Sequence, residues 1–124
     1  YTDFGRLSAE LWRACRLVLD TAIHERRWSR EEAITYLMGN SPTDREKATE
    51  AIERYLVLPS QATAYTLGML KILELRQLAE TRLGRQFDIR AFHDVVLRNG
   101  ALPLNILEEL VEDWISRRLA EQSA

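Results

Sequence analysis

The sequence has little cysteine and little lysine. Its single cysteine, Cys15, excludes an internal disulfide, and the apolar residues around it in a predicted helix indicate a buried, unreactive thiol. Lys47 and Lys71 are the only lysines, so nearly all the positive charge is carried by arginine, which binds carboxylates and phosphates bidentately. No apolar run is long enough to span a bilayer, and no signal peptide is visible.

The charge balance gives no reason to expect a polyanionic partner. The formal net charge is -2 and the sequence pI is near 5.7, so no overall field attracts nucleic acid or anionic lipid. Arg26, Arg27 and Arg30 cluster, but three glutamates lie among them and cancel the positive potential that phosphate contacts require. We expect no nucleic-acid partner, and a DNA-binding regulator is the third-ranked interpretation.

Apolar residues recur at helical spacing along six segments, and no stretch alternates as a β strand would. The sequence therefore predicts an all-α protein: a compact six-helix bundle forming one domain over residues 1–124. The tail, about residues 120–124, is expected to fray. The predicted helices cover about residues 3–25, 29–40, 43–58, 60–83, 88–99 and 103–119.

The segment 59–84 organises the rest of the chain. Its apolar residues occupy more than one helix face, which predicts a central helix surrounded by other elements. Ser60 is the expected N-cap and Gly84 the expected C-terminal stop. Two capping boxes are predicted elsewhere, one at Ser29 with Glu32 and one at Thr43 with Glu46.

The sequence contains no complete metal-binding or nucleophilic motif. His24-Glu25 resembles the start of a His-Glu-x-x-His zinc helix, but Trp28 occupies the position of the second ligand. A structural role is the more common one for a histidine such as His24 or His93. There is no Gly-x-Ser-x-Gly elbow and no glycine-rich phosphate loop, so this chain by itself is not expected to bind zinc or catalyse hydrolysis.

One polar face on the central helix has two interpretations. Gln61, Tyr65 and Gly68 fall at helical spacing, followed one turn later by Lys71. Such a face can let a ligand approach an otherwise apolar helix. Alternatively, Tyr65 packs as a core aromatic and Gly68 eases a helix crossing.

Four collinear parts of the sequence resemble the bacterial family known as domain of unknown function 885. LVLDTAIH in the segment 10–24 is similar to that family's LVVDTGIH, and WSREEA at 28–33 is similar to its WTREQA. The segment 54–76 is similar to RY…PGQALSYKIGELKILELR, and 87–104 to FDLREFHDVVLGNGALPL. Ala22 and Ser60 stand where these motifs have glycine, and Thr66 stands where they have lysine.

The resemblance implies a fold, a parent protein and a metal. Members of this family are longer helical proteins that resemble zinc metallopeptidases, and their His-Glu-x-x-His helix lies N-terminal to anything present here. Because the chain begins at Tyr1 rather than methionine, we expect it to be the C-terminal portion of such a protein. No cofactor is expected in this portion, whereas zinc is expected in the parent, which would be either cytoplasmic or periplasmic.

The resemblance also implies roles for individual residues. In related helical zinc peptidases a tyrosine facing the metal hydrogen-bonds the oxyanion, and Tyr65 matches that position. Other residues in the matching motifs are expected to line the substrate cleft: Gln61, His24, Arg16, Asp20, Asn99 and Gly100.

The sequence therefore predicts the substrate-cleft portion of a zinc-dependent peptidase acting on short peptides, inactive when isolated. The expected partners are the missing N-terminal part of the chain, the peptide substrate, and a second copy that covers an exposed apolar patch as a homodimer. The alternative interpretation is a stand-alone helical protein-interaction module.

Overall fold

The structure is a computed structural model, and it describes residues 2–121. Within that range the chain forms six α helices and one 3-10 turn, and no strand, which confirms the all-α prediction. The predicted fraying concerns mainly residues 122–124, which lie outside the described residues. The elements are α1 (Asp3–His24), α2 (Arg30–Asn40), α3 (Arg45–Val57), α4 (Gln61–Leu83), η1 (Gly84–Gln86), α5 (Ile89–Arg98) and α6 (Leu104–Ala120).

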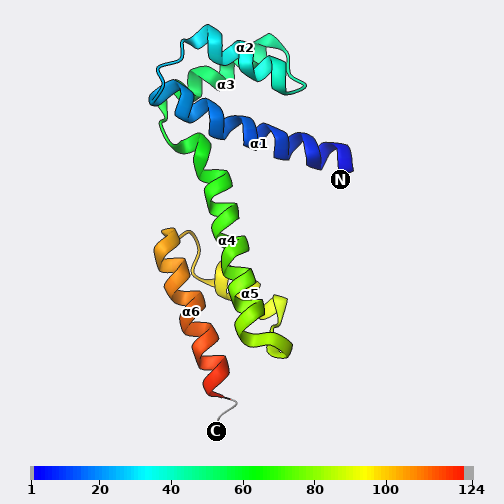
Figure 1. The fold of residues 1–124 in the computed structure, drawn as a ribbon, viewed down its shortest axis with the longest axis vertical. Helices are drawn as coiled ribbons and strands as arrows, with labels where there is room; N and C mark the ends of the chain where they lie inside the picture. Colours follow the sequence, from blue (N-terminus) through cyan, green and yellow to red (C-terminus); the bar gives the residue numbers. More distant parts are fainter. Residues whose placement is uncertain (1, 122–124) are drawn as a thin grey trace. The chain divides into compact units, whose positions relative to one another are not determined.

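The expected domain contains two compact units, residues 1–67 and residues 68–124, and α4 contributes to both (Figure 1). In the first unit α1, α2 and α3 pack around a core that also receives Ala62 from the first turn of α4. Its largest fully buried side chains are Leu19, Ile34, Leu37, Ile52 and Tyr55. This core holds the start of α4 against α1.

The second unit has its own core between the C-terminal part of α4, α5 and α6. Leu75 and Ala79 of α4 are fully buried with Phe92 of α5 and Val111 and Ile115 of α6, at 0–1% exposure. The Lys71 side chain of α4 donates a 2.8 Å hydrogen bond to Glu108 of α6. The polar face predicted around Lys71 is therefore used at this position for packing between helices.

Local sequence signals set most of the helix ends. Ser29 and Glu32 form the predicted capping box at the start of α2. Gly84 follows the last residue of α4 with a φ of 53°, as expected for a helix stop. The predicted cap of α3 is wrong by one residue, because the Asp44 carboxylate rather than Thr43 accepts from the Lys47 amide. Aspartate and threonine are both good N-caps, so sequence alone did not distinguish the two registers.

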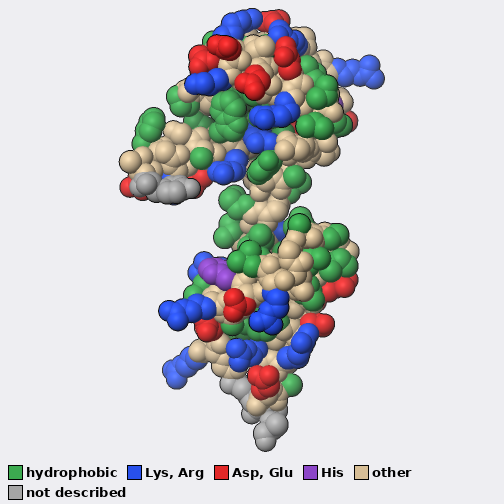
Figure 2. Space-filling model, turned by 180° about the vertical axis from the view of Figure 1, so that it is seen from behind, with side chains coloured by type: hydrophobic (Ala, Val, Ile, Leu, Met, Phe, Trp, Pro, Cys, Tyr) green, Lys and Arg blue, Asp and Glu red, His purple; other side chains and the backbone are tan. Residues whose placement is uncertain are grey.

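The burial of α4 is uneven along its length. Its ends contribute to the two cores, whereas Leu67, Leu70 and Leu73 between them are about half exposed, at 51–53%. Figure 2 shows hydrophobic side chains gathered on this stretch of α4, while acidic and basic side chains are interspersed elsewhere on the same face. The wide apolar surface predicted from the sequence is real, but the described residues cover only part of it.

The one cysteine has the environment that the sequence predicted. Cys15 is buried in the core of the first unit, and burial raises the pKa of its thiol. A protonated, enclosed thiol is a poor nucleophile, so Cys15 acts as a small apolar side chain.

Candidate functional site

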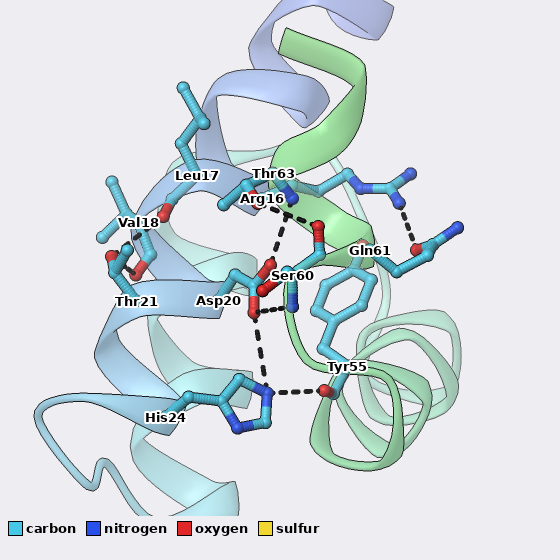
Figure 3. Close-up of polar contacts among 10 residues, drawn as sticks. All are labelled: Arg16, Leu17, Val18, Asp20, Thr21, His24, Tyr55, Ser60, Gln61 and Thr63. Carbon is cyan, nitrogen blue, oxygen red and sulfur yellow. Dashed lines mark hydrogen bonds and ion pairs between the residues drawn. The ribbon is translucent and has the colours of Figure 1, made fainter. Parts of the chain in front are cut away.

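Five of the predicted site residues meet where α1 passes the N-terminal end of α4. Arg16, Asp20 and His24 follow one another at four-residue spacing and so lie on one face of α1. Gln61 and Tyr65 occupy the first two turns of α4. Figure 3 shows Arg16, Asp20 and His24 pointing from α1 toward the segment that contains Ser60, Gln61 and Thr63.

The Asp20 carboxylate caps the N-terminus of α4 from outside that helix. Its two oxygens accept hydrogen bonds from the backbone amides of Ser60 and Thr63, each at 3.1 Å. The carboxylate is only 4% exposed, and the helix dipole adds to its stabilisation. The Thr63 amide, which a Ser60 side-chain cap would use, donates to Asp20. The predicted Ser60 cap is therefore replaced by the Asp20 carboxylate. Asp20 thus fixes the position of the first turn of α4.

Ser60 has a backbone conformation that favours glycine. Its φ is 69°, in the left-handed region, and its amide points at Asp20. The motif that the segment 54–76 resembles has glycine at this position. The substitution therefore leaves the turn intact at the cost of backbone strain in Ser60.

His24 is tied to the backbone of α3. Its Nε2 donates to the carbonyl oxygen of Tyr55 at 2.9 Å, because a carbonyl can only accept, and it lies 3.6 Å from Asp20 Oδ1. Its side chain is 30% exposed and lines a cavity of about 220 Å³ with Asp20, Ser60 and Thr63. His24 therefore joins α1 to α3.

The Arg16 guanidinium contacts two aromatic rings. Its carbon is 4.1 Å from the centre of the Tyr65 ring and 5.3 Å from that of Tyr55. Its Nη2 donates to Gln61 Oε1 at 2.9 Å. Burial raises the pKa of Tyr55, so this phenol is neutral and offers the cation a π face rather than a charge.

These contacts fix the direction of hydrogen bonding at Tyr65. Arginine can only donate, so the oxygen of the Gln61 amide must face Arg16 and its nitrogen must face Tyr65. That nitrogen donates to the Tyr65 hydroxyl oxygen at 3.2 Å. Because the hydroxyl accepts from Gln61, its own hydrogen is available for an outside acceptor. Tyr65 is 49% exposed and borders an open cavity of about 320 Å³ with Gln61 and Ala64.

The remaining two predicted site residues, Asn99 and Gly100, belong to the second unit. They form the turn after α5, where Gly100 has a φ of 68°. Asn99 lines a cavity of about 460 Å³ together with Asp94, Arg98 and Trp114.

Sequence reasoning missed the aromatic partner of Arg16. Tyr55 is a fully buried core residue, and in addition its ring flanks the guanidinium and its carbonyl oxygen accepts from His24. The sequence did contain one indication, because Arg54-Tyr55 matches the RY of the motif that the segment 54–76 resembles. No contact within α3 explained why the motif includes that pair.

The residues described here do not fit a catalytic metal. No group of three or more His, Cys, Asp or Glu side chains that could hold a metal ion occurs between residues 2 and 121. A cluster with a single imidazole and one carboxylate already bound to two amides lacks the three protein ligands that catalytic zinc requires. The arrangement can bind and orient a polar ligand.

Comparison with known proteins agrees with the motifs found in the sequence. The family model described as "Bacterial protein of unknown function (DUF885)" matches residues 1–111. The chain belongs to the DUF885 family. No curated protein matches it significantly. Among solved structures, the DUF885 chain is similar to the crystal structure of a protein from Colwellia psychrerythraea described as a "putative lipoprotein", with a TM-score of 0.90 and 51% sequence identity. That match covers 93% of this chain and 20% of the other, so the DUF885 chain spans about a fifth of that protein.

Proposed function

We propose that this DUF885 segment forms one wall of the substrate cleft of a peptidase that acts on short peptides. In this proposal Tyr65 donates a hydrogen bond to the carbonyl oxygen under attack, which becomes an oxyanion in the transition state. The observation that carries the proposal is the Gln61–Tyr65 hydrogen bond, because it leaves the hydroxyl hydrogen of a half-exposed tyrosine free to donate outward. Asp20 supports this role by fixing the first turn of α4, on which Gln61 lies.

The metal in this proposal is contributed by residues outside the segment. The described residues do not fit zinc, so no step is assigned to a metal here. The chain spans about a fifth of the Colwellia psychrerythraea protein, which leaves room in a longer protein for a separate metal-binding part. The role of this segment is to bind, orient and hydrogen-bond the substrate.

The test is peptide hydrolysis by the longer protein that contains this segment. A set of unmodified short peptides is incubated with the purified protein, with added zinc and after chelation, and the products are identified by mass spectrometry. We expect cleavage that chelation abolishes and zinc restores. Absence of cleavage across the set, or cleavage unaffected by chelation, would contradict the proposal.

Exposed apolar residues support a second candidate, a protein-interaction module. On α1 the side chains of Phe4, Leu7 and Leu11 lie at helical spacing and are 44–75% exposed. Such a stripe normally packs against another chain or another part of the same chain. We expect the 124-residue chain alone to dimerise through it, and sedimentation velocity tests this. A monomeric chain, together with an inactive longer protein, would remove support for both candidates.

The third candidate, a DNA-binding regulator, receives less support. Arg30 binds Glu31 and Glu53, and Arg45 also binds Glu31. Arginines engaged in this way carry little net positive potential for phosphates.

None of the described helices has the length and apolar character of a membrane span.

A further inference from the structure

Arg16 carries a buried positive charge that no carboxylate balances. The residue is 9% exposed, and no Asp or Glu within residues 2–121 forms an ion pair with it. Asp20, one turn further along α1, is engaged with the amides of Ser60 and Thr63. Other arginines that do have carboxylate partners, such as Arg30 and Arg76, lie in more exposed positions. Burial of an unpaired cation is unfavourable, so a buried arginine without a carboxylate partner indicates a functional role such as anion binding.

The hydrogen-bonding groups of Arg16 are also incompletely used. Its Nη2 donates to Gln61, whereas its buried Nε has no hydrogen-bond partner. The neighbouring Tyr55 and Tyr65 rings face the guanidinium with their π faces. The guanidinium therefore keeps a full charge and unused donors that suit an anion.

The surroundings select a small monoanion and indicate the side from which it enters. Arg54 also approaches the Tyr55 ring, at 6.0 Å from its centre, but Arg16 is the arginine that contacts both Gln61 and Tyr65. Its planar fork matches the two oxygens of one carboxylate. Gln61 and Tyr65 lie over the guanidinium and border the open cavity of about 320 Å³. An anion in this cavity meets Gln61 and Tyr65, the two residues that contact the Arg16 guanidinium.

We propose that Arg16 binds the C-terminal carboxylate of the peptide substrate. This inference rests on the proposed function, because it uses Tyr65 as the donor to the carbonyl under attack. The Gln61 carboxamide joins the Arg16 guanidinium to the Tyr65 hydroxyl by hydrogen bonds of 2.9 Å and 3.2 Å, and one residue of extended chain spans about 3.5 Å. A carboxylate held at Arg16 thus places a carbonyl close to the chain end beside Tyr65. The segment then selects peptides with a free C-terminus for cleavage near that end.

Binding measurements on the longer protein test the inference without requiring hydrolysis. The probes are N-acetyl-trialanine and its C-terminal amide, titrated by calorimetry into the metal-free protein. We expect the free acid to bind about 10- to 100-fold more tightly than the amide, as for a charge-assisted hydrogen bond. Equal affinities, or no binding of either peptide at millimolar concentration, would overturn the inference.

Variants then assign the preference to this arginine. Arg16→Met should reduce the acid-to-amide ratio to about twofold or less, and Arg16→Lys, which keeps the charge but not the planar fork, should give an intermediate ratio. Arg13→Met, an exposed position one turn earlier on α1, should keep the wild-type ratio. An undiminished ratio in Arg16→Met overturns the inference. If that variant does not fold, the acid-to-amide ratio of the wild-type protein is the test.

The outcomes separate this inference from its premise. Tight, Arg16-dependent binding of the free acid without any hydrolysis would contradict the proposed peptidase while supporting the carboxylate site. Zinc-dependent hydrolysis of acid and amide at equal rates would support the proposed peptidase and contradict the carboxylate site. If a carboxylate from another part of the longer protein neutralises Arg16, the wild type will show no preference and Arg16→Met will lower its melting temperature. That pair of results would overturn the inference.

Discussion

The guanidinium carbon of Arg16 lies 4.1 Å from the centre of the Tyr65 ring, so a side chain of α1 and one of α4 share a single polar cluster. Gln61 links the two, accepting from Arg16 and donating to the Tyr65 hydroxyl. Arg16 and Gln61 are 45 positions apart in the sequence and meet only where α1 lies against the start of α4. Their geometry depends on how firmly the start of α4 is held against α1, and the first predictions concern that contact.

Removing the Asp20 carboxylate should destabilise the first unit. Asp20→Ala leaves two partly buried backbone amides near the start of α4 without their acceptor, which costs about 2–4 kcal/mol. Asp44→Ala removes the exposed cap of α3 and should cost only about 1 kcal/mol. Urea denaturation followed by circular dichroism measures both. A smaller loss for Asp20→Ala than for Asp44→Ala would contradict the role assigned to Asp20.

Relieving backbone strain should stabilise the same unit. Ser60 and Arg27 have φ values of 69° and 57°, where a side chain is disfavoured and glycine is not. Ser60→Gly and Arg27→Gly are each expected to raise the free energy of unfolding by up to about 1 kcal/mol. Ser29→Gly, at a φ of -67° and with its capping hydroxyl removed, should lower it. The same urea titration decides, and a destabilised Ser60→Gly would mean that the serine side chain contributes more than its backbone costs.

Acid should destabilise the first unit partly through Glu32. The Ser29 amide and hydroxyl donate to this carboxylate and lower its pKa below the usual value for glutamate. Its contribution is complete above the unfolded pKa, about 4.3, and is lost as the pH falls through the lower folded value. Glu32→Gln keeps a hydrogen-bonding group that does not titrate. Thermal melts from pH 6 to pH 3 should therefore show a shallower loss for Glu32→Gln than for wild type, whereas parallel curves would exclude this contribution.

Much of the fold was predictable because its signals are local. The capping box of Ser29 and Glu32 and the stop at Gly84 involve residues within three positions of a helix end. The interaction of Asp20 with Thr63 spans 43 positions and has no local pattern, so the sequence predicted a Ser60 cap instead. Likewise, apolar spacing showed that Leu70 belongs to a wide apolar surface but did not show what covers it.

The candidate site was predictable in membership more than in geometry. The family resemblance indicated Arg16, Gln61 and Tyr65, whereas the hydrogen-bond direction that frees the Tyr65 hydroxyl depends on three side chains meeting in space. Composition gave no indication that Arg16 lacks a carboxylate partner. The roles of Asn99 and Gly100 in substrate binding stay predictions.

The central claim, that Tyr65 donates to the oxyanion, is tested most directly by steady-state kinetics of Tyr65→Phe in the longer protein. Phenylalanine keeps the ring beside Arg16 and removes only the hydroxyl donor. We predict a kcat about 10²–10³-fold below wild type with little change in KM, and a near-normal kcat for the control Tyr36→Phe. A Tyr65→Phe variant that folds normally and keeps a kcat within about threefold of wild type would contradict the account.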